Sequence, residues 1–176
     1  MSDVQVIGDK IDLSELVARL ARAVDRKDRS AIIACYSEQS FDDHGRFRGG
    51  REAFADFVCN DFGLSSRLDF VYHLLGQSIF DIEGDEAFGE SCFAYWIRIE
   101  PDHLYQAIGR YLDYFERAED GWKITYRRVV MDWDGSVPST DAPGSGLFLG
   151  SRDMQDPSYT RLRWPVDPAT PTSSGA

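Results

Sequence analysis

The feature that most limits how this chain can fold is a change of hydrophobic period near residue 70. Before this point, apolar residues recur every three or four positions, which is the spacing of one face of a helix. Over residues 70–134, apolar and polar residues alternate in four long runs separated by turn signals, which is typical of half-buried strands. Helices followed by consecutive antiparallel strands indicate the α+β class.

Three helices are predicted in the first part of the chain. In the first, Asp12 and Glu15 are typical of a helix start. A second, short helix is predicted to begin after Asp28 as its N-cap, and a third covers residues 51–62. A short strand and turn over residues 41–47 is expected between the second and the third. The apolar stripe of the first helix consists of Leu13, Leu16, Val17, Leu20 and Val24.

The second part predicts a meander of four strands. Hairpin turns are expected around Gly84 and Gly121. Long, strongly curved and mainly antiparallel strands can wrap around the helices and form a cone-shaped α+β barrel with an open mouth. Because Gly, Pro, Ser and Asp dominate from about Gly135, we expect one domain over residues 1–134 and an extended tail over 135–176 with a disordered end. The strands are predicted at residues 70–82, 86–99, 104–117 and 122–133.

The charge of the chain limits its partners. Nineteen Lys and Arg against 30 Asp and Glu give a formal net charge of −11 over 176 residues. Such a charge repels phosphate backbones and anionic lipid head groups, so we expect no nucleic acid and no membrane as partners. The length and the hydrophobic fraction of 43% are sufficient for one self-supporting core.

Cysteine usage and the N-terminal residues predict a cytoplasmic protein. The three cysteines are odd in number and widely spaced, which is typical of reduced thiols. The first residues lack the basic region and apolar run of a signal peptide. No run approaches the ~20 apolar residues that span a membrane.

Several charged or polar residues stand where the pattern calls for an apolar one. Asp25 lies at the edge of the first helix stripe, and His73 lies in an apolar strand start. A carboxylate that holds an imidazole fixes its tautomer and stabilises the imidazolium, so this pair could form a general base. Arg127 and Arg128 interrupt the fourth strand. Because they point to opposite faces, only one can enter a cavity, where it would stabilise developing negative charge.

Each of these residues also has a purely structural interpretation. A histidine on a strand can be a core or rim residue, and Asp25 can simply end its helix. Aromatic residues of the strands can pack the sheet or line a cavity. On the catalytic interpretation, six further side chains are predicted to bind substrate: Asp43, His44, Tyr72, Tyr95, Tyr105 and Trp133.

Other site motifs do not fit the sequence. It contains no G-x-S-x-G elbow, no phosphate loop and no G-x-G-x-x-G after a strand. Three scattered histidines without H-x-x-x-H spacing give little basis for a metal centre, although Asp43, His44 and His73 could chelate an ion. We therefore expect neither a metal nor a cofactor.

A set of short runs resembles the SnoaL-like members of the nuclear-transport-factor-2-like superfamily. The resemblance extends over residues 12–133, with further similarity in the tail at 151–153 and 156–159. The runs are AVDRKD at 23–28, CY at 35–36, DDHG at 42–45, HLLGQ at 73–77, GDEA at 84–87, GRYLD at 109–113 and GWKI at 121–124.

The resemblance implies a cone-shaped fold and a site. An Asp ending the first helix and a His opening the first long strand resemble the general-base pair of scytalone-dehydratase-like enzymes and lindane dehydrochlorinase. It implies that Asp25 orients His73, which acts as the base, and that Arg127 faces the cavity. These enzymes often have Tyr or Lys where this chain has Leu20, so another group, such as the Asp43 and His44 pair or a strand tyrosine, must polarise the leaving group.

The sequence thus predicts a cofactor-independent lyase. It would eliminate water or a small carbon fragment, such as formaldehyde, from a small hydroxylated aromatic, lignin-derived, polyketide- or steroid-like substrate. Resemblance also implies a homo-oligomer, a dimer or a trimer. The alternatives are an isomerase, a ligand-binding or interaction module without catalysis, and a structural role like that of the small subunit of ring-hydroxylating dioxygenases.

Overall fold

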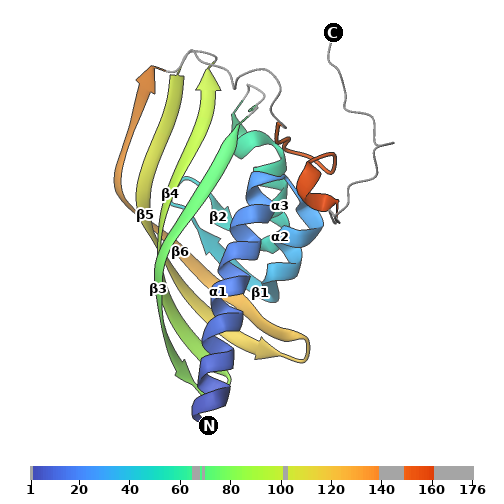
Figure 1. Ribbon diagram of the computed structural model, residues 1–176, viewed down its shortest axis with the longest axis vertical. Coiled ribbons are helices and arrows are strands. Elements are labelled where there is room, and N and C mark those ends of the chain that lie inside the picture. Colours follow the sequence, from blue (N-terminus) through green and yellow to red (C-terminus); the bar gives the residue numbers. More distant parts are fainter. Residues whose placement is uncertain (1, 65–67, 69, 101–102, 139–148, 161–176) are drawn as a thin grey trace, which may run out of the picture.

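The computed structural model describes residues 2–64, 68, 70–100, 103–138 and 149–160. Over these residues, three α-helices pack in the concave face of a curved, unclosed six-stranded sheet (Figure 1). The predicted α+β cone is confirmed. The elements are α1 Asp3–Asp25, α2 Arg29–Cys35, β1 Tyr36–Asp43, β2 Arg48–Gly49, α3 Arg51–Cys59, the 3₁₀ turn η1 Asp61–Gly63, β3 Val71–Glu83, β4 Glu86–Glu100, β5 His103–Ala118, β6 Gly121–Pro138 and the 3₁₀ turn η2 Pro157–Tyr159.

The sheet has the strand order β2-β1-β6-β5-β4-β3. The four long strands form the predicted antiparallel meander, with turns at Gly84 and Gly121 that adopt positive φ. The strand β1 pairs in parallel with β6, so that Asp42 lies beside Arg127. In this strand order, β2, which follows β1 in the chain, and β3 are the two edge strands of the sheet.

The helix α1 begins nine residues before the predicted start at Asp12. Ser2 is its N-cap and accepts a hydrogen bond from the backbone N of Gln5 at 3.3 Å. The prediction was wrong because the first two turns carry no buried apolar stripe. Polar contacts hold them instead: Asp9 accepts hydrogen bonds from Arg117 at 2.9 and 2.8 Å and from Trp122 Nε1 at 3.1 Å.

The other local predictions need small corrections. Asp28 caps α2 as predicted, accepting a hydrogen bond from the backbone N of Ala31 at 3.0 Å. The third helix ends at Cys59 rather than at residue 62, because Asp61 and Phe62 adopt left-handed φ values of 54° and 59°. The strand expected at residues 41–47 begins earlier, at Tyr36, where the chain leaves α2 and joins β6.

The strand β6 continues past Gly135 to Pro138, because its last residues pair with the start of β5. Residues 149–160 lie against α1 and α2, where Asp156 pairs with Arg26 at 3.1 Å and Tyr159 Oη donates to Asp28 at 2.8 Å. The expected disorder from residue 168 lies outside the described residues. The division into a domain and a tail stays a prediction.

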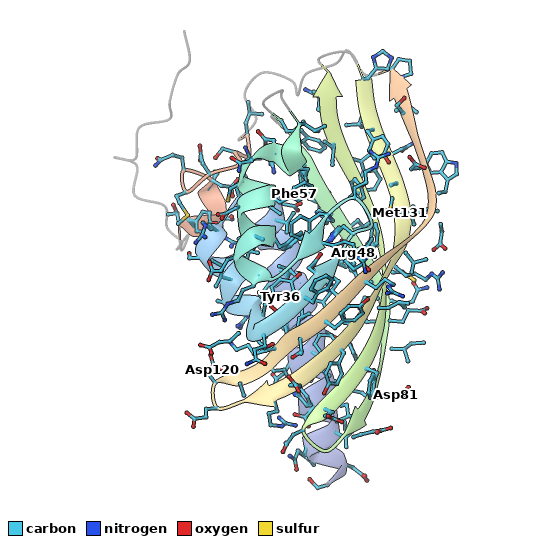
Figure 2. The ribbon with its side chains drawn as sticks, turned by 180° about the vertical axis from the view of Figure 1, so that it is seen from behind. Tyr36, Arg48, Phe57, Asp81, Asp120 and Met131 are labelled. Carbon is cyan, nitrogen blue, oxygen red and sulfur yellow. The ribbon has the colours of Figure 1, made fainter. Side chains whose placement is uncertain are left out.

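The core fills the space between the helices and the concave face of the sheet. Phe54 of α3 contacts Tyr36 of β1 edge to face, and Phe80 of β3 contacts Phe115 of β5 in the same way. Tyr36 of β1 is buried, whereas Asp120 lies at the tip of the β5–β6 hairpin (Figure 2). Within the described residues, no helix has the length and apolar character needed to cross a membrane.

Candidate active site

A cavity of about 660 Å³ lies between α1, α3 and the sheet. This volume suits a small organic molecule, and a mainly apolar lining with a few polar groups is typical of ligand sites. The main apolar and aromatic lining residues are Leu20, Val24, Phe47, Phe54, Phe57, Phe62, Phe93, Ile97, Tyr111, Val129 and Met131. The main polar ones are His44, Arg46, His73, Tyr95, Tyr105, Arg127 and Asp134.

Asp25 and His73 form a hydrogen-bonded pair at this cavity. The His73 Nδ1 lies 2.6 Å from Asp25 Oδ1, and the backbone N of His73 donates to Oδ2 at 3.1 Å. His73 lines the cavity, whereas Asp25 is buried behind it. Because an ionised carboxylate only accepts hydrogen bonds, this pair places the proton on Nδ1 and leaves Nε2 as the basic nitrogen.

The position of Asp25 is not explained by helix capping. It is the last residue of α1, where the helix dipole disfavours a carboxylate, and Asp28 rather than Asp25 caps α2. Its two oxygens are instead satisfied by His73. The end of α1 is also fixed from outside, since Arg152 Nε donates to the Asp25 carbonyl oxygen at 3.2 Å.

Of the two arginines in β6, Arg127 faces the cavity. Its Nε and Nη2 donate to Asp113 at 2.7 and 2.6 Å, and its guanidinium lies 3.9 Å from the ring centroid of Tyr111. Burial would lower the pKa of Arg127, but the charge and hydrogen bonds of Asp113 raise it, so the guanidinium stays charged. Arg128 points outward, where it lies 3.6 Å from Asp43.

A second carboxylate–imidazole pair borders the same cavity. The His44 Nδ1 contacts Asp42 Oδ1, and the hydroxyl of Tyr36 donates to Asp42 Oδ2. Asp42 is completely buried, while His44 stacks on Phe54 with 5.0 Å between ring centroids. Burial raises the pKa of Tyr36 well above its ordinary value, so its hydroxyl remains a donor to Asp42.

The strand tyrosines Tyr95 and Tyr105 form a third polar group. Tyr105 donates to Asp134 at 2.7 Å, and the ring centroids of the two tyrosines are 6.0 Å apart. Burial raises the pKa of both tyrosines, and in Tyr105 the bond to Asp134 raises it further. Both are therefore neutral hydroxyl groups over the physiological pH range.

Comparison with known proteins assigns the family. A family model described as a SnoaL-like domain matches residues 5–128, which is most of the chain. The chain belongs to this family. No curated protein matches the sequence.

Solved structures share the fold of this SnoaL-like protein. A hexachlorocyclohexane dehydrochlorinase (LinA type 2) superposes with a TM-score of 0.72 at 14% identity, over 83% of this chain and 100% of the other. LinA type 3 from Novosphingobium barchaimii gives 0.68 at 16% identity, over 84% and 98%. A candidate scytalone dehydratase from Novosphingobium aromaticivorans gives 0.68 at 15%, over 85% and 100%. At these identities the likeness establishes the fold alone.

Three of the predicted substrate-binding residues of this SnoaL-like protein do not line the cavity. Tyr72 precedes His73 on β3, so strand alternation turns it to the outer face, where it is 47% exposed. Trp133 is 50% exposed and lies against Gly135. Asp43 accepts a hydrogen bond from the backbone N of Gly45 at 3.0 Å and pairs with Arg48 at 3.2 Å, away from the cavity. The other three, His44, Tyr95 and Tyr105, are lining residues.

Three acidic residues of the site are absent from the predicted set. Asp42 and Asp113 are buried counter-ions, and Asp134 is a lining residue that binds Tyr105. Asp113 could have been identified, because it alternates with the buried Tyr111 and Phe115 on one face of β5. Asp42 stands beside Asp43 in a charged run before His44, and the sequence does not reveal which of the two adjacent aspartates points inward.

No metal centre is found in the part of the chain that the structure describes. There, no three His, Cys, Asp or Glu side chains are grouped so that they could hold an ion.

Proposed function

We propose that this SnoaL-like protein is a cofactor-independent lyase with His73 as its general base and Asp25 as the residue that orients it. The observation that carries the proposal is the hydrogen bond of 2.6 Å between His73 Nδ1 and a buried carboxylate at the wall of an aromatic cavity. A base held in one tautomer against an acceptor keeps Nε2 free for the substrate and gains stabilisation once it is protonated.

The proposed step begins at a carbon next to an electron-withdrawing or phenolic group. Nε2 of His73 takes the proton from this carbon, and the electron pair of the C–H bond forms a double bond. The bond to a hydroxyl group on the neighbouring carbon breaks, and water leaves after protonation of its oxygen. In the loss of formaldehyde, the base takes the hydroxyl proton of a hydroxymethyl group, and the O–H electron pair forms the C=O bond of formaldehyde. The electron pair of the broken carbon–carbon bond forms a carbon–carbon double bond, and the hydroxyl on the neighbouring carbon leaves as water after protonation.

Arg127 is proposed to stabilise negative charge that develops on the substrate. Two of its nitrogens are engaged by Asp113, which leaves Nη1 outside that pair. A guanidinium fixed in this way needs no reorganisation during the reaction. Its contribution is nevertheless reduced by the neutralising charge of Asp113.

The cavity supports the proposed substrate class. Its lining is rich in phenylalanine and tyrosine, which favours stacking with a flat ring, and few polar groups are available to orient hydroxyl substituents. We therefore propose a small hydroxylated aromatic, lignin-derived, polyketide- or steroid-like compound. The names of two structural neighbours, a dehydrochlorinase and a candidate dehydratase, both refer to eliminations. We also propose that the protein acts in the cytoplasm.

The test is product formation by the purified protein. It is incubated with aromatic β-hydroxyketones, diaryl propanediols and hydroxylated ketosteroids, and conjugated alkenes and formaldehyde are measured. The expected result is a new alkene from at least one class. A product with the same composition as its substrate but a shifted double bond would indicate an isomerase. Binding without turnover of any compound would indicate a ligand-binding module, and stable co-purification with a larger iron–sulfur subunit would indicate the dioxygenase-type role.

A further inference from the structure

The second carboxylate–imidazole pair, Asp42 with His44, is not used by the base mechanism, although it is built like the first. Asp42 is completely buried and has both oxygens engaged, one by His44 Nδ1 and one by the Tyr36 hydroxyl. A buried carboxylate of this kind is costly unless it is paired and hydrogen-bonded. His44, by contrast, lines the cavity, and its side chain is 29% exposed.

The two pairs reach the cavity from strands that are far apart in the strand order of the sheet. His73 is on β3, which is one edge of the sheet, whereas His44 directly follows β1 near the other edge. The sheet curves around the helices (Figure 1), and both histidines line one cavity. Both histidines bind their carboxylates through Nδ1. In each ring, Nε2 is therefore the nitrogen left for a ligand.

We propose that His44, whose Nδ1 contacts the buried Asp42 and which lines the cavity, supplies from Nε2 the proton that the leaving oxygen takes, so that His44 is the general acid and His73 the base. The inference rests on the proposed lyase function. It names the group that protonates the leaving oxygen, because the side chain of Leu20 cannot do so. A base and an acid that line one cavity can act on the two ends of the bond system that rearranges in an elimination.

The proposed step balances in atoms and charge. His73 Nε2 takes a proton from carbon, and the C–H electron pair becomes the new carbon–carbon double bond. The electron pair of the C–O bond stays with oxygen, which takes the proton from His44 Nε2 and leaves as water. His73 ends as the imidazolium and His44 as the neutral ring, and proton exchange with solvent restores both.

Other groups in the cavity are less suited to this role. Tyr105 already donates its hydroxyl proton to Asp134, and Arg127 is a permanent cation that stabilises charge but does not give up a proton at physiological pH. Asp43 points away from the cavity. The hydroxyls of Tyr95 and Tyr111 remain; Tyr111 is 5% exposed and packs beneath Arg127, so Tyr95 serves as the rival in the test.

The test compares two substrates that differ in their need for an acid. β-Hydroxypropiophenone must lose hydroxide unless its oxygen is protonated, whereas β-(p-nitrophenoxy)propiophenone loses a stable phenolate. Both give phenyl vinyl ketone. The protein, His44→Gln, Tyr95→Phe and His73→Ala are assayed on both, and circular dichroism with thermal unfolding verifies that each variant is folded.

His44→Gln is expected to lower kcat/KM for the hydroxy compound roughly 10²-fold or more. For the nitrophenoxy compound, the loss in kcat/KM is expected to be smaller by a factor of about ten or more. His73→Ala is expected to lose both activities. Equal losses on both compounds in His44→Gln, or the selective loss in Tyr95→Phe instead, would overturn the assignment of His44. If the unaltered protein eliminates neither compound, the same hydroxy and nitrophenoxy pair is made from the panel substrate that it does eliminate. Elimination of no panel substrate would overturn the lyase proposal, and the assignment with it.

Should His44→Gln not fold, His44→Asn is the replacement. It is expected to produce the same selective loss, because it also lacks an acidic proton. A variant that is folded and fully active on the hydroxy compound contradicts the proposal in either case.

Discussion

Arg127 and Asp113 form a buried ion pair whose members cannot be changed independently. Only 3% of the Arg127 side chain and 1% of the Asp113 side chain are exposed. Asp113→Ala leaves a buried guanidinium without its counter-ion, so we expect it to lower the free energy of unfolding by about 3–5 kcal/mol. Urea unfolding followed by tryptophan fluorescence measures the change.

The neighbouring Arg128 provides the matched control. Its side chain is 55% exposed and pairs only loosely with Asp43. Arg128→Gln is therefore expected to change the stability by less than about 0.5 kcal/mol. A similar loss in Arg128→Gln and Asp113→Ala would contradict the inward and outward assignment of the two arginines.

At the residue scale, interrupted apolar patterns drew attention to residues that the structure places at or behind the cavity, while only the family resemblance favoured Arg127 over Arg128. Asp25, His73 and Arg127 stand out because each interrupts an apolar pattern. Tyr72 could have been left out, because strand alternation turns it away from the face of His73. Trp133 was included because an aromatic residue fits both faces of a sheet, and the structure leaves it 50% exposed. The contact of Asp42 with His44 could not be predicted, because it depends on how the chain turns after β1. The pairing of Asp113 with Arg127 could not be predicted either, because it depends on the register between β5 and β6.

Among the elements, β5 depends on a glycine at the point where its pairing with β6 shifts register. A Cβ atom on Gly109 would lie 2.2 Å from the Val130 carbonyl oxygen and 2.8 Å from the Phe93 ring. Because one of these atoms belongs to the backbone, Gly109→Ala forces β6 to move. We expect a loss of about 1–3 kcal/mol in the free energy of unfolding, measured by urea denaturation.

Gly8 in α1 is the matched control for this substitution. A Cβ atom there has no neighbour within 4 Å. Gly8→Ala is expected to stabilise the protein by about 0.5–1 kcal/mol, since alanine loses less backbone entropy in a helix. A stabilising effect of Gly109→Ala, or equal effects at both sites, would refute the packing described at the β5–β6 shift.

The N-terminal half of α1 is predicted to be sensitive to acid. Hydrogen bonds from Arg117 hold the pKa of Asp9 below its ordinary value despite burial, and the bond from Trp122 lowers it further. A carboxyl group whose pKa is lower in the folded state stabilises the protein above its unfolded pKa, which is about 3.9. This stabilisation is lost as the pH falls through the lower, folded-state value.

Thermal unfolding of the protein and of Asp9→Asn across pH 2–7 tests this prediction. At neutral pH the Tm of Asp9→Asn is expected to be the lower of the two. Below about pH 4 the difference is expected to shrink, because the protonated Asp9 resembles asparagine. A difference in Tm that stays constant across this range would show that Asp9 does not act through its charge.

At the element scale, the period change predicted the order of helices and strands, and the hairpin turns were placed by their glycines. The early start of α1 was missed because its first turns are held by Asp9 rather than by an apolar face. The left-handed residues after α3 were also missed. Asp61 is held there by Lys27 and by Arg152, which lies 91 positions later in the chain.

Across the whole molecule, the outer face of the sheet carries an apolar row that the cavity does not use. Cross-strand pairing aligns Leu74 with Ala94, Ala94 with Ile108, and Ile108 with Trp133. About half of each of Leu74, Ile108 and Trp133 is exposed. Such a contiguous row favours burial against another protein surface.

We therefore expect the protein to be a homo-oligomer, a dimer or a trimer, in solution. Light scattering after size exclusion is predicted to give a multiple of the 19.9 kDa chain mass. Ile108→Lys places a charge in the row and is expected to shift the protein to the monomer, with unchanged circular dichroism. A native monomer at micromolar concentration would contradict the expectation.

The cone as a whole followed from the sequence because long alternating strands and amphipathic helices have few ways to bury their apolar faces. The chemistry follows less directly, since the same cone can host several activities. What narrows it is the pair of Asp25 with His73 and the aromatic cavity in front of it.

The most direct test of the lyase account is therefore the elimination rate of Asp25→Asn and His73→Ala, measured with the best substrate of the panel. Both variants are expected to lower kcat/KM roughly 10²–10⁴-fold while retaining their fold, because each removes one half of the general base. Near-native rates in both folded variants would show that the hydrogen bond between Asp25 and His73 is structural and that the base lies elsewhere.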